Sequence, residues 1–251
     1  MKKLLLILIF FASGISVAQT PCVGGMAGEF PCEGFDLQSR ISLAEFGSSF
    51  GNDSWGWTDP LDGKEYALMG LGGKLPSHTT SSFWRDIKVY ENHAFVVSEA
   101  GGHGMQIFDL TRLRSVASPP ENFTEDAHYS GFGSAHNLVI NEDSGFAYGV
   151  GTSTFNGGPH MVNIQDPLNP VFVGGFGFTQ YCHDAQVITY NGPDSDYTGR
   201  EILFGSNEDE VVIVDVTDKF NPISISSISY SNVAYTHQGW FTEDQRYFIV
   251  G

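Results

Sequence analysis

Basic residues are scarce in this sequence. Its 251 residues contain 12 Lys and Arg against 29 Asp and Glu, which gives a formal net charge of −17. Such a surface repels the phosphates of nucleic acids and anionic lipids, so we expect no nucleic-acid partner. It attracts cations, and solubility in a salty exterior is the simpler account of the charge.

Long apolar runs are also lacking, apart from one at the N-terminus. Lys2 and Lys3 precede an apolar run over residues 4–12, and the small residues Ser16 and Ala18 suit signal peptidase. The run is shorter than the roughly 20 residues of a membrane-spanning helix. The sequence therefore predicts a signal peptide over residues 1–18, no transmembrane segment, and an exported chain that is extracellular or at the cell surface.

Cysteine is limited to three positions. Cys22 and Cys32 bracket a Gly-rich stretch close to the predicted cleavage site, and in an oxidising compartment they predict a disulfide within an N-terminal segment, residues 19–50. Cys182 has no obvious partner. It is either a buried small apolar residue or a reactive thiol beside His183.

A repeat emerges from the rest of the chain. One apolar pattern that ends near an Asp recurs over residues 105–110, 160–166 and 211–216. The last two of these segments continue into matching Asp-x-x-Asn-Pro turns. Asp caps such a turn, and Pro ends a strand because it lacks the N–H. Upstream, Trp84, His136, His183 and His237 open successive units, 52, 47 and 54 residues apart. A β-rich unit near 50 residues is typical of propeller blades.

The predicted fold is therefore all-β, a β-propeller-like array of four-stranded blades over residues 51–251. The unit containing residues 65–71 lacks the length for its third strand and Pro turn, so we expect a defective blade there. The unit opened by His237 holds only two strands before Gly251. This pattern predicts an incomplete array, a fragment of a longer reading frame.

Several segments resemble a known family. Residues 212–215 look like the core of the LVIVD repeat, and residues 55–60, 84–89, 206–209 and 235–240 resemble the choice-of-anchor B family of exported bacterial proteins. The resemblance implies a secreted or cell-surface propeller-like protein, with an anchor or sorting domain expected beyond Gly251. It implies no enzymatic activity, and the gap after Leu71 departs from the family pattern.

The candidate site is a set of equivalent histidines. His136, His183 and His237 occupy one place in successive units, so their side chains should form an arc on one face. Imidazoles in such an arc, with Asp184 or Asp86 as carboxylate partner, could hold a divalent metal. Alternatively, the repeat reuses these histidines for hydrogen bonds between blades. The other five histidines share no position, and we expect them at the surface or in turns: His78, His93, His103, His128 and His160.

Two functions follow from these observations. The first is a non-catalytic binding or scaffold propeller for an extracellular protein or polysaccharide, because no nucleophile–base set is recognisable and no catalytic residue is assigned. The alternative is a metal-dependent extracellular hydrolase or lyase that uses the histidine arc. No other cofactor is indicated by the sequence.

Overall fold

The computed structural model describes residues 19–71, 75–177 and 180–251. The predicted signal peptide, residues 1–18, lies outside these ranges. The chain divides into two compact units, Met1–Phe46 and Gly47–Gly251.

The described part of the first unit is held by local contacts. Strands β1 (Met26–Ala27) and β2 (Phe30–Pro31) form an antiparallel hairpin, and a disulfide joins Cys22 to Cys32 with 5.9 Å between their Cα atoms. The predicted disulfide is thus confirmed. The short helix α1 (Leu43–Phe46) begins with a capping box, since the Glu45 carboxylate accepts from the Ser42 N–H at 2.8 Å.

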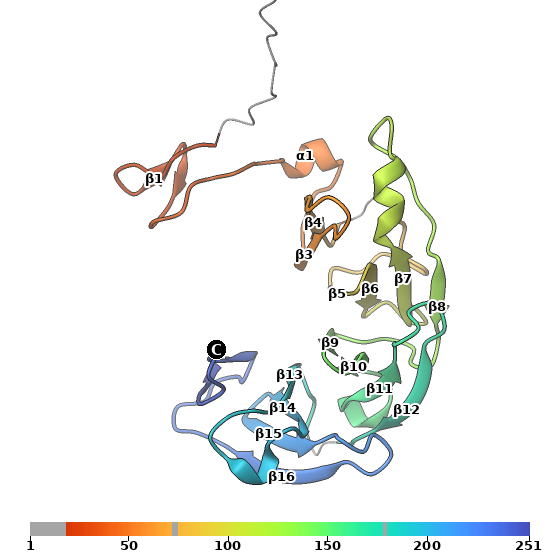
Figure 1. Ribbon diagram of the computed structural model, residues 1–251, viewed down its shortest axis with the longest axis vertical. Coiled ribbons are helices and arrows are strands. Elements are labelled where there is room, and N and C mark those ends of the chain that lie inside the picture. Colours follow the sequence, from red (N-terminus) through yellow and green to blue (C-terminus); the bar gives the residue numbers. More distant parts are fainter. Residues whose placement is uncertain (1–18, 72–74, 178–179) are drawn as a thin grey trace, which may run out of the picture. The chain divides into compact units, whose positions relative to one another are not determined.

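The described residues of the second unit form three four-stranded antiparallel sheets, each in simple up-and-down order (Figure 1). We call them blades 2, 3 and 4. Blade 2 consists of β5 (Arg85–Tyr90), β6 (His93–Ser98), β7 (Met105–Asp109) and β8 (Ala127–Tyr129). Blade 3 consists of β9 (Asn137–Asn141), β10 (Phe146–Val150), β11 (His160–Asn163) and β12 (Val171–Gly175). Blade 4 consists of β13 (Asp184–Thr189), β14 (Glu201–Asn207), β15 (Glu210–Asp215) and β16 (Ile223–Ile228).

Two-stranded sheets flank these blades. Blade 1 pairs β3 (Ser54–Thr58) with β4 (Glu65–Met69), and blade 5 pairs β17 (Gly239–Phe241) with β18 (Phe248–Val250). Both blades therefore have two strands in the described residues, as the sequence predicts. Short 3₁₀ turns complete the unit: η1 (Leu110–Ser115), η2 (Phe155–Gly157) and η3 (Ser195–Tyr197).

The repeat in the sequence is a repeat in structure. In blades 3 and 4 the pairing to the outermost strand shifts register at equivalent places, between Met161 and Val162 and between Ile213 and Val214. Each outer pair is joined by the predicted Asp-Pro turn, where Asp218 Oδ1 accepts from the backbone N–H of Phe220 at 3.0 Å. The all-β fold with blade-like four-stranded sheets is confirmed.

The blades pack face to face, and the core lies between them. One buried cluster joins blade 2 to blade 3 through side chains such as Phe95, Ile107 and Leu138. Another joins blade 3 to blade 4 and includes Tyr148 and Leu203, both fully buried. Because apolar side chains project from both faces of each sheet, these strands lack the polar-outside alternation of a solvated sheet.

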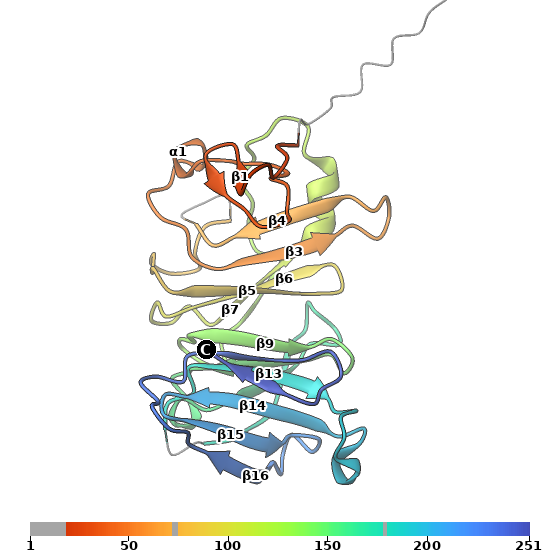
Figure 2. The same ribbon diagram turned by 90° about the vertical axis from the view of Figure 1, so that its left-hand side faces the viewer.

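The first strand of each blade lies next to the first strand of the following blade, in the order β3, β5, β9, β13 and β17 (Figures 1 and 2). We call these five the inner strands. They place residues from five distant parts of the sequence side by side, and they line the candidate site.

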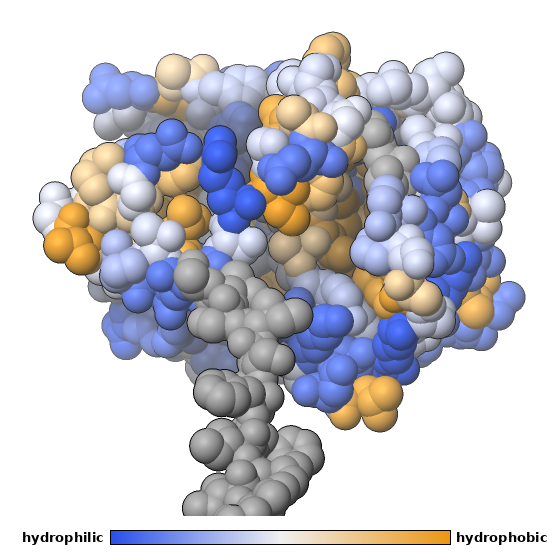
Figure 3. All heavy atoms as spheres, turned by 90° about the horizontal axis from the view of Figure 1, so that it is seen from above, coloured by the Kyte–Doolittle hydropathy of each residue, from blue (hydrophilic) through white to orange (hydrophobic). Residues whose placement is uncertain are grey.

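The surface reflects the composition. Hydrophilic side chains predominate on the face seen in Figure 3, and apolar side chains gather near its middle. Within the described residues, no helix combines the length and apolar character that crossing a membrane requires.

Candidate functional site

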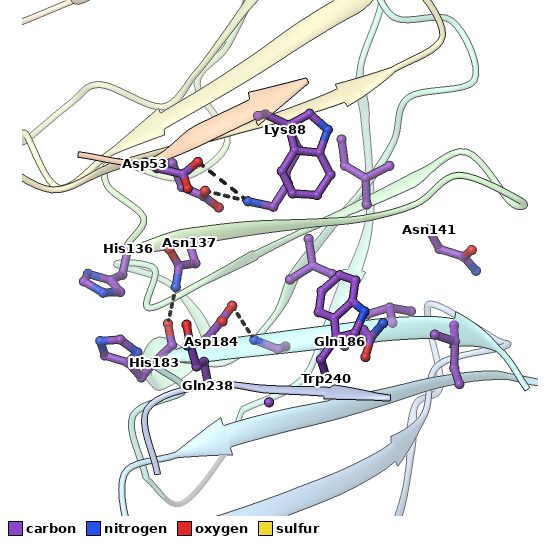
Figure 4. A pocket seen from close by; sticks show the side chains of 18 of the residues that line it. Asp53, Lys88, His136, Asn137, Asn141, His183, Asp184, Gln186, Gln238 and Trp240 are labelled. Carbon is purple, nitrogen blue, oxygen red and sulfur yellow. Dashed lines mark hydrogen bonds and ion pairs between the residues drawn. The ribbon is translucent and has the colours of Figure 1, made fainter. Parts of the chain in front are cut away.

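An open groove runs along the inner strands of the second unit (Figure 4). Its volume is about 1170 Å³, and every one of the five blades contributes to its lining. Residues that far apart in sequence meet here because each blade begins with a strand at the same place. The repeat thus builds one continuous surface from one recurring strand.

Hydrogen bonds from side chain to backbone fix each inner strand to the next. Asp53 Oδ2 accepts from the Ile87 N–H at 2.9 Å, and Asp86 Oδ2 accepts from the Leu138 N–H at 2.7 Å. These two bonds join blade 1 to blade 2 and blade 2 to blade 3.

The same device continues along the array. Asn137 Nδ2 donates to the carbonyl oxygen of His183 at 3.0 Å, and Gln186 Oε1 accepts from the Phe241 N–H at 2.8 Å. Polar side chains in the groove are therefore held by the framework, which limits the entropy that a bound ligand would have to remove.

The structure brings the three predicted histidines together. Ring centroids are 4.2 Å apart for His136 and His183, and 4.3 Å apart for His183 and His237. Trp84, which takes the equivalent place in blade 2, lies 6.1 Å from His136. These four rings form a row along one edge of the groove, each just before an inner strand.

Hydrogen bonds and burial determine how the histidines of the row are protonated. His183 Nδ1 lies 2.8 Å from the carbonyl oxygen of His237, so it is the protonated nitrogen that donates, and Nε2 is left as the basic one. His136 Nδ1 lies 2.6 Å from Glu99 Oε1. Burial, together with the neighbouring His136, lowers the pKa of His183 to about 4, so its ring is neutral at pH 7.

Asp184, the predicted carboxylate partner, starts strand β13. Its Oδ1 accepts from the Ala185 N–H at 2.8 Å, and burial raises the pKa of its carboxyl. Among the residues that the structure describes, no set of three or more His, Cys, Asp or Glu side chains is arranged to hold a metal ion. A metal site at the histidine row stays a prediction.

A second cluster of charged groups lies beside the row. Lys88 Nζ is 2.6 Å from Asp86 Oδ1 and 3.9 Å from Asp53 Oδ2, and it sits 4.6 Å from the centre of the Trp55 ring. Burial raises the pKa of Asp86 to about 7, against the opposing effect of the Lys88 ammonium. Asp86 thus joins blade 2 to blade 3, and the pKa of its carboxyl lies near neutrality.

Sequence reasoning missed most of the groove lining. Lys88, Gln186 and Gln238 were not selected, although a signal was present, whereas Trp240 was one of four tryptophans that could stack on sugars if exposed. On an inner strand alternate side chains face the groove, so the residues two places after Asp86, Asp184 and Gln238 belong to the same surface. A polar or aromatic residue two places after each of these positions is therefore the sequence signal of the groove.

Two predictions outside the groove need correction. His103 and His160 were expected at the surface or in turns, but both side chains are buried, with exposed fractions of 0% and 4%. His160 fits between the hydroxyls of Tyr129 (2.7 Å) and Thr154 (3.0 Å), and burial lowers its pKa to about 4. Each ring fills a gap in the core and still has polar partners, which a sequence pattern does not reveal.

Cys182 is fully buried, and burial raises the pKa of its thiol well above the usual value. A thiol that is neutral and inaccessible is a poor nucleophile. Of the two readings of this residue, the buried apolar one agrees with the structure.

Fold and groove together define a β-propeller-like protein whose inner strands line an open groove. The sequence matches no protein-family model and no curated protein. Among solved structures, it resembles that of a protein from Lactobacillus plantarum, with 12% sequence identity and a TM-score of 0.44. That likeness covers 78% of this chain, which spans about half (54%) of the length of the Lactobacillus protein.

Proposed function

We propose that this protein is an exported, non-catalytic binding module whose ligand lies in the groove of the inner strands. One observation supports the proposal above the others: side chains from five blades line a single groove of about 1170 Å³. Small-molecule sites usually measure ~300–1,000 Å³, so the groove has room for an extended ligand.

Rigidity is the second support. Asp53, Asp86, Asn137 and Gln186 each form a hydrogen bond to the backbone of the neighbouring inner strand. A ligand would therefore meet side chains that are already ordered. Pre-organised polar groups of this kind favour binding because little freedom is lost on association.

Export belongs to the same proposal. The predicted signal peptide over residues 1–18 and the Cys22–Cys32 disulfide both suit an oxidising exterior. The resemblance to LVIVD-repeat, choice-of-anchor B proteins supports a place at the cell surface, with residues 19–50 as an N-terminal segment ahead of the propeller. Its anchor would follow Gly251.

The test compares two arginine substitutions on one hairpin. Gln238 is exposed and lines the groove, whereas Tyr247 is 64% exposed and lies outside the groove lining. Fluorescently labelled wild type should bind saturably to cell-envelope preparations of the producing organism. Gln238→Arg, which fills the groove, should abolish this binding, and Tyr247→Arg should leave it intact.

The comparison has a clear negative result. If the two variants bind envelopes equally well, or if the wild type does not bind, the groove is not the binding surface. Circular dichroism spectra that match the wild type establish that each variant is folded.

A further inference from the structure

We infer that the groove binds a neutral polysaccharide chain, with a sugar ring stacked on Trp240. This inference deepens the proposed function and depends on it. It combines three features of the groove: an exposed indole, amide groups with unused hydrogen-bonding capacity, and a charge that disfavours anions.

The indole of Trp240 is available for stacking. Trp240 lies on β17, its side chain is 59% exposed, and it lines the groove (Figure 4). Trp55 on β3 also lines the groove, but Lys88 Nζ lies 4.6 Å from its ring centre. The face of an aromatic ring is the negative end of its quadrupole, so it attracts the weakly positive C–H groups on one face of a pyranose. Trp84 is also exposed and lines the groove, but its ring centre lies 6.1 Å from that of His136, in the histidine row. We therefore assign Trp240 as the platform.

Amides surround that platform. Gln186 on β13 uses Oε1 to accept from the Phe241 N–H, and within the described residues its Nε2 forms no hydrogen bond. The side chain of Gln238, the residue just before β17, likewise forms none to the described part of the chain. Amides both donate and accept, and sugar hydroxyls require both. Asp184, on the strand next to Trp240, adds a carboxylate acceptor.

Charge narrows the ligand class further. The groove lining includes the acids Asp53, Asp86, Glu142, Asp143 and Asp184. Two basic residues also line it: Lys88 is engaged by two of these carboxylates, and Arg85 is buried and donates to the carbonyl oxygen of Ser82. Acidic polysaccharides and nucleic acids would be repelled, because like charges across an interface oppose association. A neutral polyhydroxylated ligand meets no such penalty and uses the amides fully.

The length of the groove favours a chain over a single sugar. The lining extends along all five inner strands, from β3 to β17. A polymer could therefore lie along it and bind through its interior.

Affinity electrophoresis in gels containing defined polysaccharides tests the inference. The neutral probes are laminarin, arabinoxylan, galactomannan and dextran, with cationic chitosan and anionic alginate for comparison. We expect at least one neutral polysaccharide to retard the wild type, and alginate to have no effect. Trp240→Ala should weaken that binding about tenfold or more, equivalent to the loss of one stacking contact.

Tyr247→Ala is the matched control, since it removes an exposed aromatic ring from the same hairpin but outside the groove lining. Its affinity should stay within about twofold of the wild type, a difference well below 1 kcal/mol. Gln238→Ala provides a second groove variant, and it should also weaken binding.

Three results would overturn the inference: no retardation by any neutral polysaccharide, retardation by chitosan or alginate alone, or equal affinities of the Trp240→Ala and Tyr247→Ala variants. The envelope experiment with arginine variants separates this failure from failure of the proposed function. If envelope binding depends on the groove while the polysaccharides do not bind, only the sugar assignment falls.

Discussion

The ionisation of Asp86 should make the protein less stable as the pH rises through neutrality. Its side chain is 3% exposed, and burial raises its pKa from 3.8 to about 7. Because the folded chain favours the protonated form, the stability from this group is complete below pH 3.8 and is lost as the pH rises through 7. The full difference corresponds to about 4 kcal/mol, at 1.36 kcal/mol for each pH unit.

The comparison with Asp86→Asn isolates this effect, because Asn has the shape of the neutral acid and does not titrate. Between pH 5 and pH 8 the free energy of unfolding of the wild type should fall by about 2–3 kcal/mol more than that of the variant. Urea denaturation followed by tryptophan fluorescence measures both. Asp143→Asn, at an exposed carboxylate, should show no such difference from the wild type.

Several bonds to the Asp86 carboxylate oppose the effect of burial on its pKa. The N–H groups of Ile87 and Leu138 and the Lys88 ammonium all bond to the Asp86 carboxylate, and each favours its charged form. The contrary outcome is that the difference in free energy of unfolding between wild type and Asp86→Asn stays constant with pH, or that the wild type gains stability as the pH rises. Either result would show that these bonds outweigh burial and would refute the reasoning.

Three further predictions concern other parts of the second unit. In NMR titrations the His183 ring should protonate only near pH 4, and a midpoint above pH 6 would contradict this. The stability that its neutral ring contributes is therefore present above pH 6.5 and is lost as the pH falls toward 4. Lys219→Met should lower the free energy of unfolding by about 3–5 kcal/mol, because it leaves buried Glu201 without the ammonium 2.8 Å away. Adding Glu201→Gln should recover much of that loss, as urea denaturation can measure. Elemental analysis should find no stoichiometric metal, since within the described residues no three His, Cys, Asp or Glu side chains are arranged to hold one; metal that is lost in His183→Ala would instead support the enzyme alternative.

The fold was predictable because its signals are local and repeated. Apolar runs that end in Asp-Pro turns mark the outer strands, and the turn at Asp218 forms the side-chain cap that the sequence leads one to expect. A spacing near 50 residues then implies equivalent positions around an array. The histidine row follows from this equivalence alone, since His136, His183 and His237 need only occupy the same place in successive blades.

The groove was less predictable because its chemistry depends on partners distant in sequence. Nothing around Asp86 indicates that its carboxylate will reach the N–H of Leu138, 52 residues later, or that Lys88 will lie against Trp55. Burial of His160 depends likewise on Tyr129, which belongs to another blade. Such facts follow from how blades stack, and a single repeat does not encode them.

The residues at the start of the inner strands have two roles that constrain each other. Asp86, Asn137 and Gln186 hold the next blade through one polar atom and leave other polar atoms at the groove. Substituting such a residue therefore changes the stacking of blades together with the binding surface. Gln238 and Trp240 differ, since both are exposed and their side chains form no hydrogen bond to another blade within the described residues. Ligand specificity can thus change at these two positions without loss of the hydrogen bonds that join the described blades.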